Sequence, residues 1–286
     1  MYAIIRSFKL MKVDFSKYSN NLELRENGIW FSKDTQTISY PEDGNDLCLA
    51  LEDFSFWFRH RNNCIVELVK KFSLHENFFD VGGGNGYVSL GLQNAGINVA
   101  LLEPGISGVI NAKKRNIENV VCATTQNCGL ASEFVENIGV FDVVEHISDE
   151  QDFLRSCHKM LKTNGKIFVT VPAFKFLWSK EDDYSGHFRR YTINTLKTSL
   201  ENAGFKLLYT SYLFSPLPLP IYFMRTLPSK LNMHKNYNDK DKFLKEHKSE
   251  KSSGILEKVW QWELNKVKAL SKIPFGSTVI AVAEKI

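Results

Sequence analysis

Apolar residues change their spacing along the chain, and this change predicts alternating strands and helices from residue 77 onward. Short continuous apolar runs are typical of buried strands, whereas apolar positions that recur every three or four residues are typical of helices packed on one face. Strands that alternate with helices form a parallel sheet covered on both faces. We therefore expect an α/β fold, with strands at 77–81, 98–104, 119–125, 137–142, 165–172, 205–214 and 276–285, and helices at 86–96, 106–116, 149–162 and 192–204.

The pattern also divides the chain into three parts. Residues 1–46 are polar and mixed, with turn signals, and are interpreted as an N-terminal extension. Residues 47–215 and 273–286 form the predicted main domain, which opens with one or two helices over 47–72. Residues 216–272 interrupt this domain and carry 12 Lys/Arg against 6 Asp/Glu, a net charge of +6.

The interrupting segment combines apolar and basic character. It contains the apolar stretch "PLPLPIYFM" and the amphipathic stretch "ILEKVWQWELNKVKAL". This combination predicts a helical insertion that acts as a lid over a substrate or as an interfacial membrane contact. A helical subdomain with a solvated face is the plainer alternative. The lysine-rich stretch 235–254, which is low in apolar residues, is expected to be a solvated excursion.

Composition narrows the class of protein. The hydrophobic share of 43% and the charged share of 24% are ordinary for a soluble globular protein. The net charge of +4 is too small to indicate a nucleic-acid partner. Five scattered cysteines without metal-type pairing indicate reduced thiols, a cytoplasmic location and no metal site. No signal peptide and no membrane-spanning stretch are predicted, which leaves peripheral membrane contact as the open alternative.

A glycine-rich turn directly follows the first predicted strand. The sequence "FFDVGGGNGY" places Gly82, Gly83, Gly84 and Gly86 there, where ligands of open α/β sheets bind near a helix N-terminus. The dinucleotide fingerprint G-x-G-x-x-G is absent, and no Lys-Ser/Thr pair follows as a phosphate-binding loop requires. The pattern is instead an acidic residue, Asp80, followed by glycines at alternate positions.

This pattern resembles motif I of the class I S-adenosylmethionine-dependent methyltransferases. Glu103 at the end of the second strand, "NIGVFDVVEHI" and "LKTNGKIFVTVPA" resemble the family's later segments in the same order. Thr163 and Asn164 replace the usual Pro and first Gly of the last of these. The resemblance implies a Rossmann-like, seven-stranded, mostly parallel sheet with an antiparallel C-terminal strand and helices on both faces.

Three shorter segments are similar to a narrower group. "FWFRHRN", "LWSKEDDYSGHFRRYT" and "IPFGSTVIAVAEK" resemble bacterial type 11/12 methyltransferases related to the ubiquinone and menaquinone enzymes. Many members of this group lie in cell-surface polysaccharide loci, so the resemblance implies a small, glycan-linked or lipid-linked acceptor. The resemblance implies S-adenosylmethionine as cofactor and S-adenosylhomocysteine as product.

The resemblance also implies which residues bind the cofactor. The glycines admit its methionine portion, Asp80 lies near its ammonium group, and Glu103 accepts hydrogen bonds from its ribose hydroxyls. Further candidates are Thr125 and Gln126 beside the adenine, Asp142 at a strand end, and Trp57 with Arg61 on one helix face. The alternatives are a tight structural turn for the glycines, a loop-capping role for Asp142, and a buried tryptophan with a solvated arginine.

His146 is the candidate catalytic base, because imidazole titrates near neutral pH. Glu145 beside it is a candidate to orient the imidazole. Methyl transfer from a sulfonium has a good leaving group, so positioning and desolvation can suffice without a base. The alternative is that both residues tie the loop after the strand to its neighbours.

The loop "GHFRRYT" supplies the candidate acceptor-binding residues His187, Arg190 and Tyr191. Arginine suits a phosphate or carboxylate, so an anionic acceptor is expected. The alternative is a basic loop that pairs with "KEDD" just upstream. Thr192 is the predicted N-cap of the helix that follows.

Three function classes follow from the sequence. The expected one is a methyltransferase acting on a small or glycan- or lipid-linked acceptor. A nucleic-acid methyltransferase is the second, although "DVVEHI" stands where base-amino enzymes have an Asn/Asp-Pro-Pro-aromatic motif. A cofactor-binding protein without catalysis is the third. The acceptor atom and the oligomeric state have no signal in the sequence.

Overall fold

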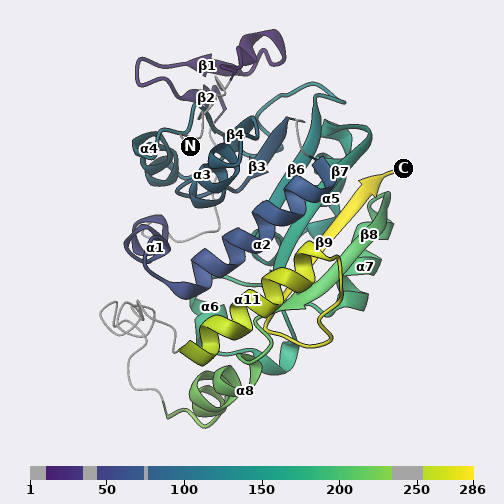
Figure 1. Ribbon diagram of the computed structural model, residues 1–286. Coiled ribbons are helices and arrows are strands. Elements are labelled where there is room, and N and C mark those ends of the chain that lie inside the picture. Colours follow the sequence, from purple (N-terminus) through teal and green to yellow (C-terminus); the bar gives the residue numbers. More distant parts are fainter. Residues whose placement is uncertain (1–10, 35–43, 74–76, 234–253) are drawn as a thin grey trace, which may run out of the picture.

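A nine-stranded sheet runs through the computed structural model, which describes residues 11–34, 44–73, 77–233 and 254–286 (Figure 1). The strand order is β1-β2-β5-β4-β3-β6-β7-β9-β8. The strands are β1 (Leu22–Leu24), β2 (Trp30–Ser32), β3 (Phe78–Val81), β4 (Val99–Leu102), β5 (Asn119–Cys122), β6 (Val135–Phe141), β7 (Leu161–Pro172), β8 (Phe205–Leu213) and β9 (Thr278–Lys285).

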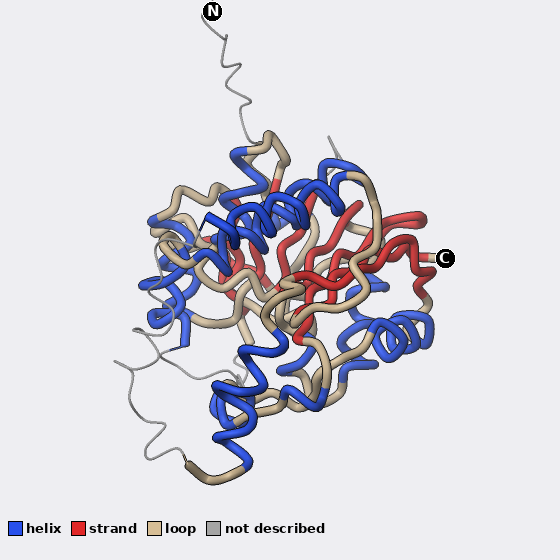
Figure 2. Tube along the Cα trace, turned by 60° about the horizontal axis from the view of Figure 1, so that its bottom comes forward, coloured by secondary structure: helices blue, strands red, loops and turns tan. Residues whose placement is uncertain are grey.

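Helices lie on both faces of this sheet, as the sequence predicted (Figures 1 and 2). The α-helices are α1 (Gly44–Glu52), α2 (Phe56–Ser73), α3 (Tyr87–Asn94), α4 (Ile106–Lys114), α5 (Glu150–Met160), α6 (Lys180–Tyr184), α7 (Ile193–Asn202), α8 (Pro218–Ile221), α9 (Leu227–Lys230) and α11 (Gly254–Lys268). Short turns of other helix types are η1 (Phe15–Lys17), η2 (Val144–His146), η3 (Lys175–Leu177) and η4 (Tyr222–Thr226), the last a π-helical turn that joins α8 to α9.

Two apolar layers hold the helices on the sheet. On one face, α5 and α7 pack Leu154 and Leu196 into the cluster that contains the strand residues Val140 and Val169. On the other face, α2, α3 and α11 pack against strand residues such as Phe78 and Phe168. Because both faces are covered, the strands are apolar almost throughout, which explains why their sequences are continuous apolar runs.

The predicted strand count of seven is wrong, because β1 and β2 add two strands at one edge. Trp30 pairs with Val121 of β5 in parallel, and β1 pairs with β2 in antiparallel. Both strands come from residues 1–46, which were interpreted as a polar extension. Each has only three residues, too few to show a periodic pattern in the sequence.

The antiparallel insertion of the last strand is confirmed. β9 lies between β7 and β8 and pairs in antiparallel with both. The other strands from β2 to β8 therefore run in one direction, and their carboxyl ends share one edge of the sheet. Loops after β3, β4, β6, β7 and β8 meet at this edge, which in parallel α/β sheets is where ligands bind.

Two local predictions can be compared with helix ends. Thr192 is the N-cap of α7, where its hydroxyl accepts a hydrogen bond from the Thr195 amide, as predicted. The helix expected over 149–162 ends at Met160, and Leu161 already pairs with Val135 of β6.

The lysine-rich stretch 235–254 lies outside the described residues except for its last residue. No described helix is long and apolar enough to cross a membrane.

Candidate functional site

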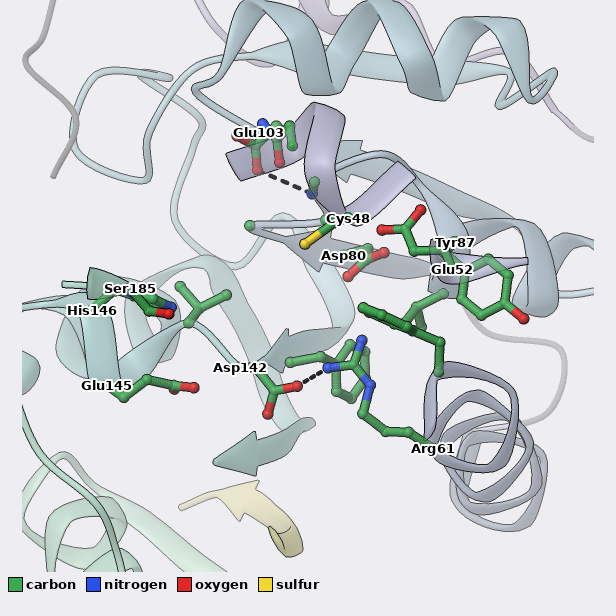
Figure 3. Close-up of a pocket in the computed structure, with 18 of the residues that line it drawn as sticks. Cys48, Glu52, Arg61, Asp80, Tyr87, Glu103, Asp142, Glu145, His146 and Ser185 are labelled. Carbon is green, nitrogen blue, oxygen red and sulfur yellow. Dashed lines mark hydrogen bonds and ion pairs between the residues drawn. The ribbon is translucent and has the colours of Figure 1, made fainter. Parts of the chain in front are cut away.

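A cavity of about 380 Å³ opens at the carboxyl edge of the sheet. Its wall comes from α1, α2, the glycine turn after β3, the ends of β4, β6 and β7, and the loop that follows α6. Figure 3 shows how side chains from these elements point toward one another. The residues that the argument uses are Asn45, Glu52, Trp57, Arg61, Asp80, Gly82, Gly83, Gly84, Glu103, Asp142, Glu145, His146, Ser185 and His187.

The glycine turn brings backbone rather than side chains to the cavity. Gly82 and Gly84 have φ angles of 71° and 51°, in the left-handed region that favours glycine. A Cβ on Gly82 would lie 2.4 Å from Val143, and one on Gly83 would lie 2.8 Å from Leu101. The packing of the turn and its opening toward the cavity therefore both require glycine.

Gly86 has a different role from its neighbours. It lies outside the cavity lining and is the N-cap of α3, with a φ of 76°. A Cβ there would lie 3.1 Å from Ala112 of α4 and 3.0 Å from Ile117. Gly86 thus allows α3 and α4 to approach each other, and its assignment to cofactor contact stays a prediction.

Glu103 lies buried beside the turn at the end of β4. Its two carboxylate oxygens accept hydrogen bonds from the Gly84 amide at 3.0 Å and the Gly105 amide at 2.7 Å. Burial raises the pKa of Glu103, and these two amide hydrogen bonds act in the opposite direction. The carboxylate is thereby fixed in the cavity wall, where it could accept further hydrogen bonds from a ligand's hydroxyls.

Asp80 at the end of β3 is 1% exposed and lines the same wall. Its carboxylate accepts a hydrogen bond of 2.7 Å from the Ser89 hydroxyl. Complete burial raises the pKa of Asp80 to about 6, although the Ser89 hydrogen bond lowers it. A cationic group in the cavity would favour the ionised form of this carboxylate.

Arg61 and Asp142 form an ion pair across the cavity (Figure 3). The Arg61 guanidinium also lies 4.6 Å from the ring centroid of Trp57, which is on the same face of α2. The alternative of a solvated arginine is wrong, since Arg61 is 8% exposed. Burial lowers the pKa of the Arg61 guanidinium, and nearby Glu52 opposes this change.

Asp142 is held in a conformation that is uncommon for an aspartate. Its φ is 56°, and its carboxylate accepts a hydrogen bond of 3.0 Å from the Thr170 hydroxyl. Such left-handed backbone persists where surrounding contacts fix it, and it is often found at functional sites. Asp142 therefore turns the chain from β6 into η2 and places the following residues along the cavity.

Glu145, His146 and His187 gather on the wall opposite Arg61. Burial raises the pKa of Glu145 to about 8, so its protonated form is favoured at neutral pH. Burial, followed by the neighbouring His187, lowers the pKa of His146 to about 4. The rings of His146 and His187 have centroids 4.6 Å apart.

These three side chains could also hold a divalent cation. Each offers one ligand atom, and these atoms lie within 4.8 Å of one another. Imidazole nitrogens with a carboxylate oxygen suit first-row metals. The expectation of no metal site came from cysteine spacing alone, and it stays a prediction.

The loop "GHFRRYT" is arranged differently from the prediction. Arg190 donates to both carboxylate oxygens of Asp182, at 2.6 and 3.1 Å, and to the Ala173 carbonyl at 3.0 Å. Burial alone would raise the pKa of Asp182, but the hydrogen bonds from His187 and Arg190 outweigh it and hold the value at about 2. The structure thus agrees with the alternative interpretation, in which this basic loop pairs with the upstream acidic segment "KEDD".

Tyr191, another candidate acceptor-binding residue, does not face the cavity. It is 2% exposed, lies outside the cavity lining, and donates its hydroxyl hydrogen to Glu150 of α5. Thr125 and Gln126 also lie outside the lining. His187 is the member of the predicted acceptor loop that reaches the cavity, where its Nδ1 lies 2.8 Å from Asp182.

Several lining residues had no signal in the sequence. Asn45, Cys48 and Glu52 come from α1, and Ser185 comes from the end of α6. Glu52 pairs with Arg115 of α4 at 3.0 Å, so α1 is held over the glycine turn from outside the motif. The sequence predicted that this helix covers the sheet. Nothing in its pattern of polar residues indicated that some of them face a cavity.

The side chains present fit the expected cofactor. Besides Glu145, whose protonated form is favoured at neutral pH, four carboxyl groups and one arginine line the cavity. This balance favours a ligand with positive charge, as the sulfonium and ammonium groups of S-adenosylmethionine provide. Among the described residues, the buried atoms Arg61 Nε and Glu145 Oε2 have no hydrogen-bond partner. Buried polar atoms are normally paired, so both are available to a ligand.

Comparison with known proteins gives matches in the same region. Residues 57–210 match the family described as a methyltransferase domain. The ubiquinone biosynthesis O-methyltransferase of Pseudomonas aeruginosa is 28% identical over 98 residues, which cover 32% of this chain and 42% of that protein. The human mitochondrial protein of the same description is 28% identical over 101 residues, 32% of this chain and 27% of that protein. The matches thus span less than half the length of these curated relatives.

Solved structures agree with the fold. A protein from Archaeoglobus fulgidus, described as a SAM dependent methyltransferase, has a TM-score of 0.51 and 18% identity, with 83% of this chain and 98% of that chain covered. A possible histamine N-methyltransferase from Thermotoga maritima has a TM-score of 0.50 and 18% identity, with 80% and 93% covered. At these identities the likeness concerns the fold.

Proposed function

The chain belongs to the methyltransferase domain family, which its match over residues 57–210 establishes, and from this premise we propose that it methylates a hydroxyl group of a small, uncharged acceptor. It is an S-adenosylmethionine-dependent enzyme of class I. That cofactor supplies a methyl group on a sulfonium, which is a good leaving group. The acceptor and its reacting atom are the proposed part.

The observation that carries the proposal is the position of Glu145, His146 and His187. They line the same cavity as Asp80, Glu103 and the glycine turn, on a different wall (Figure 3). A cofactor held by the first wall would leave its reacting end in the space between the two. A hydroxyl in that space could donate its hydrogen to a side chain of the second wall. Curated relatives described as O-methyltransferases support the same acceptor atom.

Glu145 is the stronger candidate for the proton acceptor. A general base is most effective when its pKa lies near the working pH, and the pKa of Glu145 is about 8 whereas that of His146 is about 4. The neutral imidazole of His146 would instead accept a hydrogen bond from a second polar hydrogen of the acceptor and so orient it, because the reacting hydroxyl has a single hydrogen, which goes to Glu145. This division reverses the roles expected from the sequence, and the catalytic role of His146 is the alternative that the experiment must distinguish.

We infer an uncharged acceptor because the arginines of the loop "GHFRRYT" already bind groups of the protein itself. Arg190 is bound to Asp182, and Arg189 donates to the carbonyls of Ile147 and Ser148. Neither is a lining residue. Among the described residues, Arg61 is the one arginine or lysine that lines the cavity, and it pairs with Asp142, so the anionic group expected from the sequence meets no other guanidinium or ammonium group there. A polar but uncharged head matches the cavity better.

Turnover of the Glu145→Gln variant tests the proposal. The wild type, given labelled methyl donor, is expected to label a compound in the small-molecule or lipid fraction of a cell extract, at a hydroxyl oxygen identified by mass spectrometry. Glu145→Gln should lower turnover by roughly 10²-fold or more, while affinity for S-adenosylhomocysteine is unchanged. The wild-type rate should rise with pH up to about 8, as Glu145 ionises, and the variant should lack this rise.

Three other outcomes would contradict the proposal. If His146→Ala loses turnover and Glu145→Gln does not, the base is misassigned. Label in nucleic acid would favour the second function class, and cofactor binding without any turnover would favour the third. A chelator added to the assay separates the side-chain base from a divalent cation held by the same three residues, because only the latter activity would be lost.

A further inference from the structure

The helical stretch α8–η4–α9 turns its apolar side toward solvent. Leu219 and Phe223 are four residues apart, so they share one face of the helix, and Leu231 follows the last residue of α9; the three side chains are 66%, 61% and 59% exposed. Met224 beside them is 73% exposed. In a helix that only covers a protein core, these residues would point inward.

The opposite side of the same stretch holds it on the protein. Thr226 is fully buried and donates its hydroxyl hydrogen to the Leu177 carbonyl at 2.9 Å. Arg225 donates to Glu181 of α6 at 2.6 Å, and the Ser229 hydroxyl accepts from the Lys180 amide. In Figure 2 the stretch projects from the lower side of the molecule, away from the strands. Its exposed apolar side is therefore a fixed feature of the surface.

Aromatic rings extend this apolar surface back to the sheet. Phe275 lies 5.1 Å from Phe174, Phe174 lies 5.3 Å from Phe176, and Phe176 lies 6.3 Å from Tyr222, measured between ring centroids. Phe176 and Phe275 are themselves more than one third exposed. We call the surface formed by Phe176, Leu219, Phe223, Met224, Leu231 and Phe275 the apolar patch.

The segments that carry the apolar patch contribute charges of one sign. These segments, 173–177, 214–233 and 269–277, contain Lys175, Lys230 and Lys272, together with Arg225, whose charge is paired with Glu181 of α6. They contain no aspartate or glutamate, although the whole chain has 32. Apolar side chains bordered by cations complement a surface that is apolar inside and anionic at its rim, as an anionic lipid bilayer is.

The apolar patch adjoins the mouth of the cavity. Pro172 and Thr278 line the cavity, and Phe174 and Phe275 lie two and three residues from them along the chain. Residues 214–233 follow β8, whose carboxyl end lies at the same edge of the sheet. A compound leaving the patch could thus enter the cavity along protein surface.

We propose that α8–η4–α9 and the neighbouring phenylalanines insert into the interfacial layer of an anionic lipid membrane. Contiguous apolar surface that is exposed beside polar residues marks interaction sites, and an interfacial helix buries its apolar face at the boundary of head groups and acyl chains. The supply of a membrane-dissolved acceptor to the cavity rests on the proposed function, whereas membrane binding does not.

Other occupants fit less well. The segment 234–253 that follows Met233 contains three large apolar residues, Tyr237, Phe243 and Leu244, among many charged ones. It offers too little apolar area to cover the patch. A second copy of the chain would bring the same cations against the patch, and like charges oppose each other.

Vesicle binding of the wild type and of a double variant, Leu219→Ser with Phe223→Ser, tests the proposal. The probe is vesicles of phosphatidylcholine with a minor share of phosphatidylglycerol, sedimented with the protein in the absence of any acceptor. The double variant should partition at least roughly tenfold less, because two apolar side chains no longer enter the lipid. Leu24→Ser is the matched control, since Leu24 is 48% exposed on β1 at the opposite edge of the sheet, and should bind as the wild type does.

Two further measurements complete the test. Lys175→Gln with Lys230→Gln should weaken binding to the anionic vesicles and leave weak binding to pure phosphatidylcholine unchanged. Unchanged affinity for S-adenosylhomocysteine and an unchanged melting temperature show that each variant is folded.

The proposal is overturned if the wild type does not bind the vesicles, or if the double variant binds them equally. It is also overturned if the wild type is a dimer that the double variant dissociates, without vesicle binding, since the apolar patch is then an interface between copies. Because no methyl transfer is measured, these failures leave the proposed function untouched.

Discussion

The two described parts of the segment 216–272, which contain α8–η4–α9 and α11, are both helical and basic, but they differ in how far they bury their apolar residues. α11 buries Trp260 and Val267 in the core layer shared with α2 and β8. The Trp260 ring stacks on Phe56 at 5.5 Å and lies 5.0 Å from the His60 ring. The stretch α8–η4–α9 instead leaves Leu219 and Phe223 largely in solvent.

One buried carboxylate explains much of this difference. Glu263 of α11 is fully buried, and it accepts hydrogen bonds from the Phe214 and Ser215 amides, from the Ser215 hydroxyl and from His60. These partners come from the end of β8 and from α2, so α11 is locked to two elements at once. Nothing equivalent holds α8–η4–α9, whose described contacts run to η3 and α6.

Because the two parts differ in this way, the role of a lid or of a membrane contact cannot apply to the whole segment 216–272. α11 is part of the core and can leave it only by breaking a buried polar network. Among the described residues, α8–η4–α9 has the larger exposed apolar surface, with Leu219, Phe223 and Met224. In contrast, α11 exposes Ile255 and Trp262 and buries or partly buries the rest of its apolar face. The following changes separate the two parts by their effect on stability.

Glu263→Ala should have the largest effect. The loss of the carboxylate leaves two amides, a hydroxyl and an imidazole without their acceptor in a buried site, and removing one member of such a network costs about 3–5 kcal/mol of unfolding free energy. Urea denaturation followed by circular dichroism measures it. Glu257→Ala on the exposed face of the same helix is the control and should cost less than about 1 kcal/mol. Equal effects of the two would mean that α11 is not anchored as described.

The stability of the α11 anchor should also depend on pH. Burial alone would raise the pKa of Glu263, but its hydrogen bonds, led by that from His60, outweigh burial and lower it below its ordinary value of 4.5. A lowered folded-state pKa gives stability that is present above pH 4.5 and is lost as pH falls through the folded value. The difference in unfolding free energy between wild type and Glu263→Gln should therefore shrink below pH 4.5, by up to about 1.4 kcal/mol per pH unit. A constant difference would contradict the lowered pKa.

Changes in α8–η4–α9 should be small. Thr226→Val removes the hydrogen bond to Leu177 and should cost about 1 kcal/mol, whereas Thr226→Ser keeps the hydroxyl and should recover most of it. Phe223→Ser on the exposed side should change stability by less than about 0.5 kcal/mol. Thermal unfolding of the three variants compares them. A large loss for Phe223→Ser would show that this side chain is covered, and would remove the basis of the apolar patch.

The sequence predicted the central sheet because each strand there is local and apolar. The order of strands and helices from 77 to 214 follows from runs that are buried on both faces, whereas the antiparallel direction of the closing strand was implied by the family resemblance. The strands β1 and β2 were not predicted, because three residues are too few to show a period. The pairing of β2 with β5 also depends on contacts with residues about 90 positions away.

The glycine turn with Asp80 and Glu103 was predictable because its chemistry lies within one short stretch of chain. Positive φ angles and close approach demand glycine at fixed spacing, whatever the rest of the protein does. The residues that face this turn were only partly predictable. His146 and Glu145 are adjacent in sequence, but their different pKa values come from burial, which no local pattern reveals.

By itself, the sequence determined the fold class and the glycine turn, because these depend on local spacing of apolar residues and glycines, and it indicated the family through the resemblance of its short motifs. Only the tertiary structure decided which charged groups are already paired. Arg190 meets Asp182 eight residues away, Arg61 meets Asp142 across the cavity, and Glu263 meets His60 from the other end of the chain. A charge is available to a ligand only after its partners within the fold are counted, and those partners are set by packing between elements that the sequence separates.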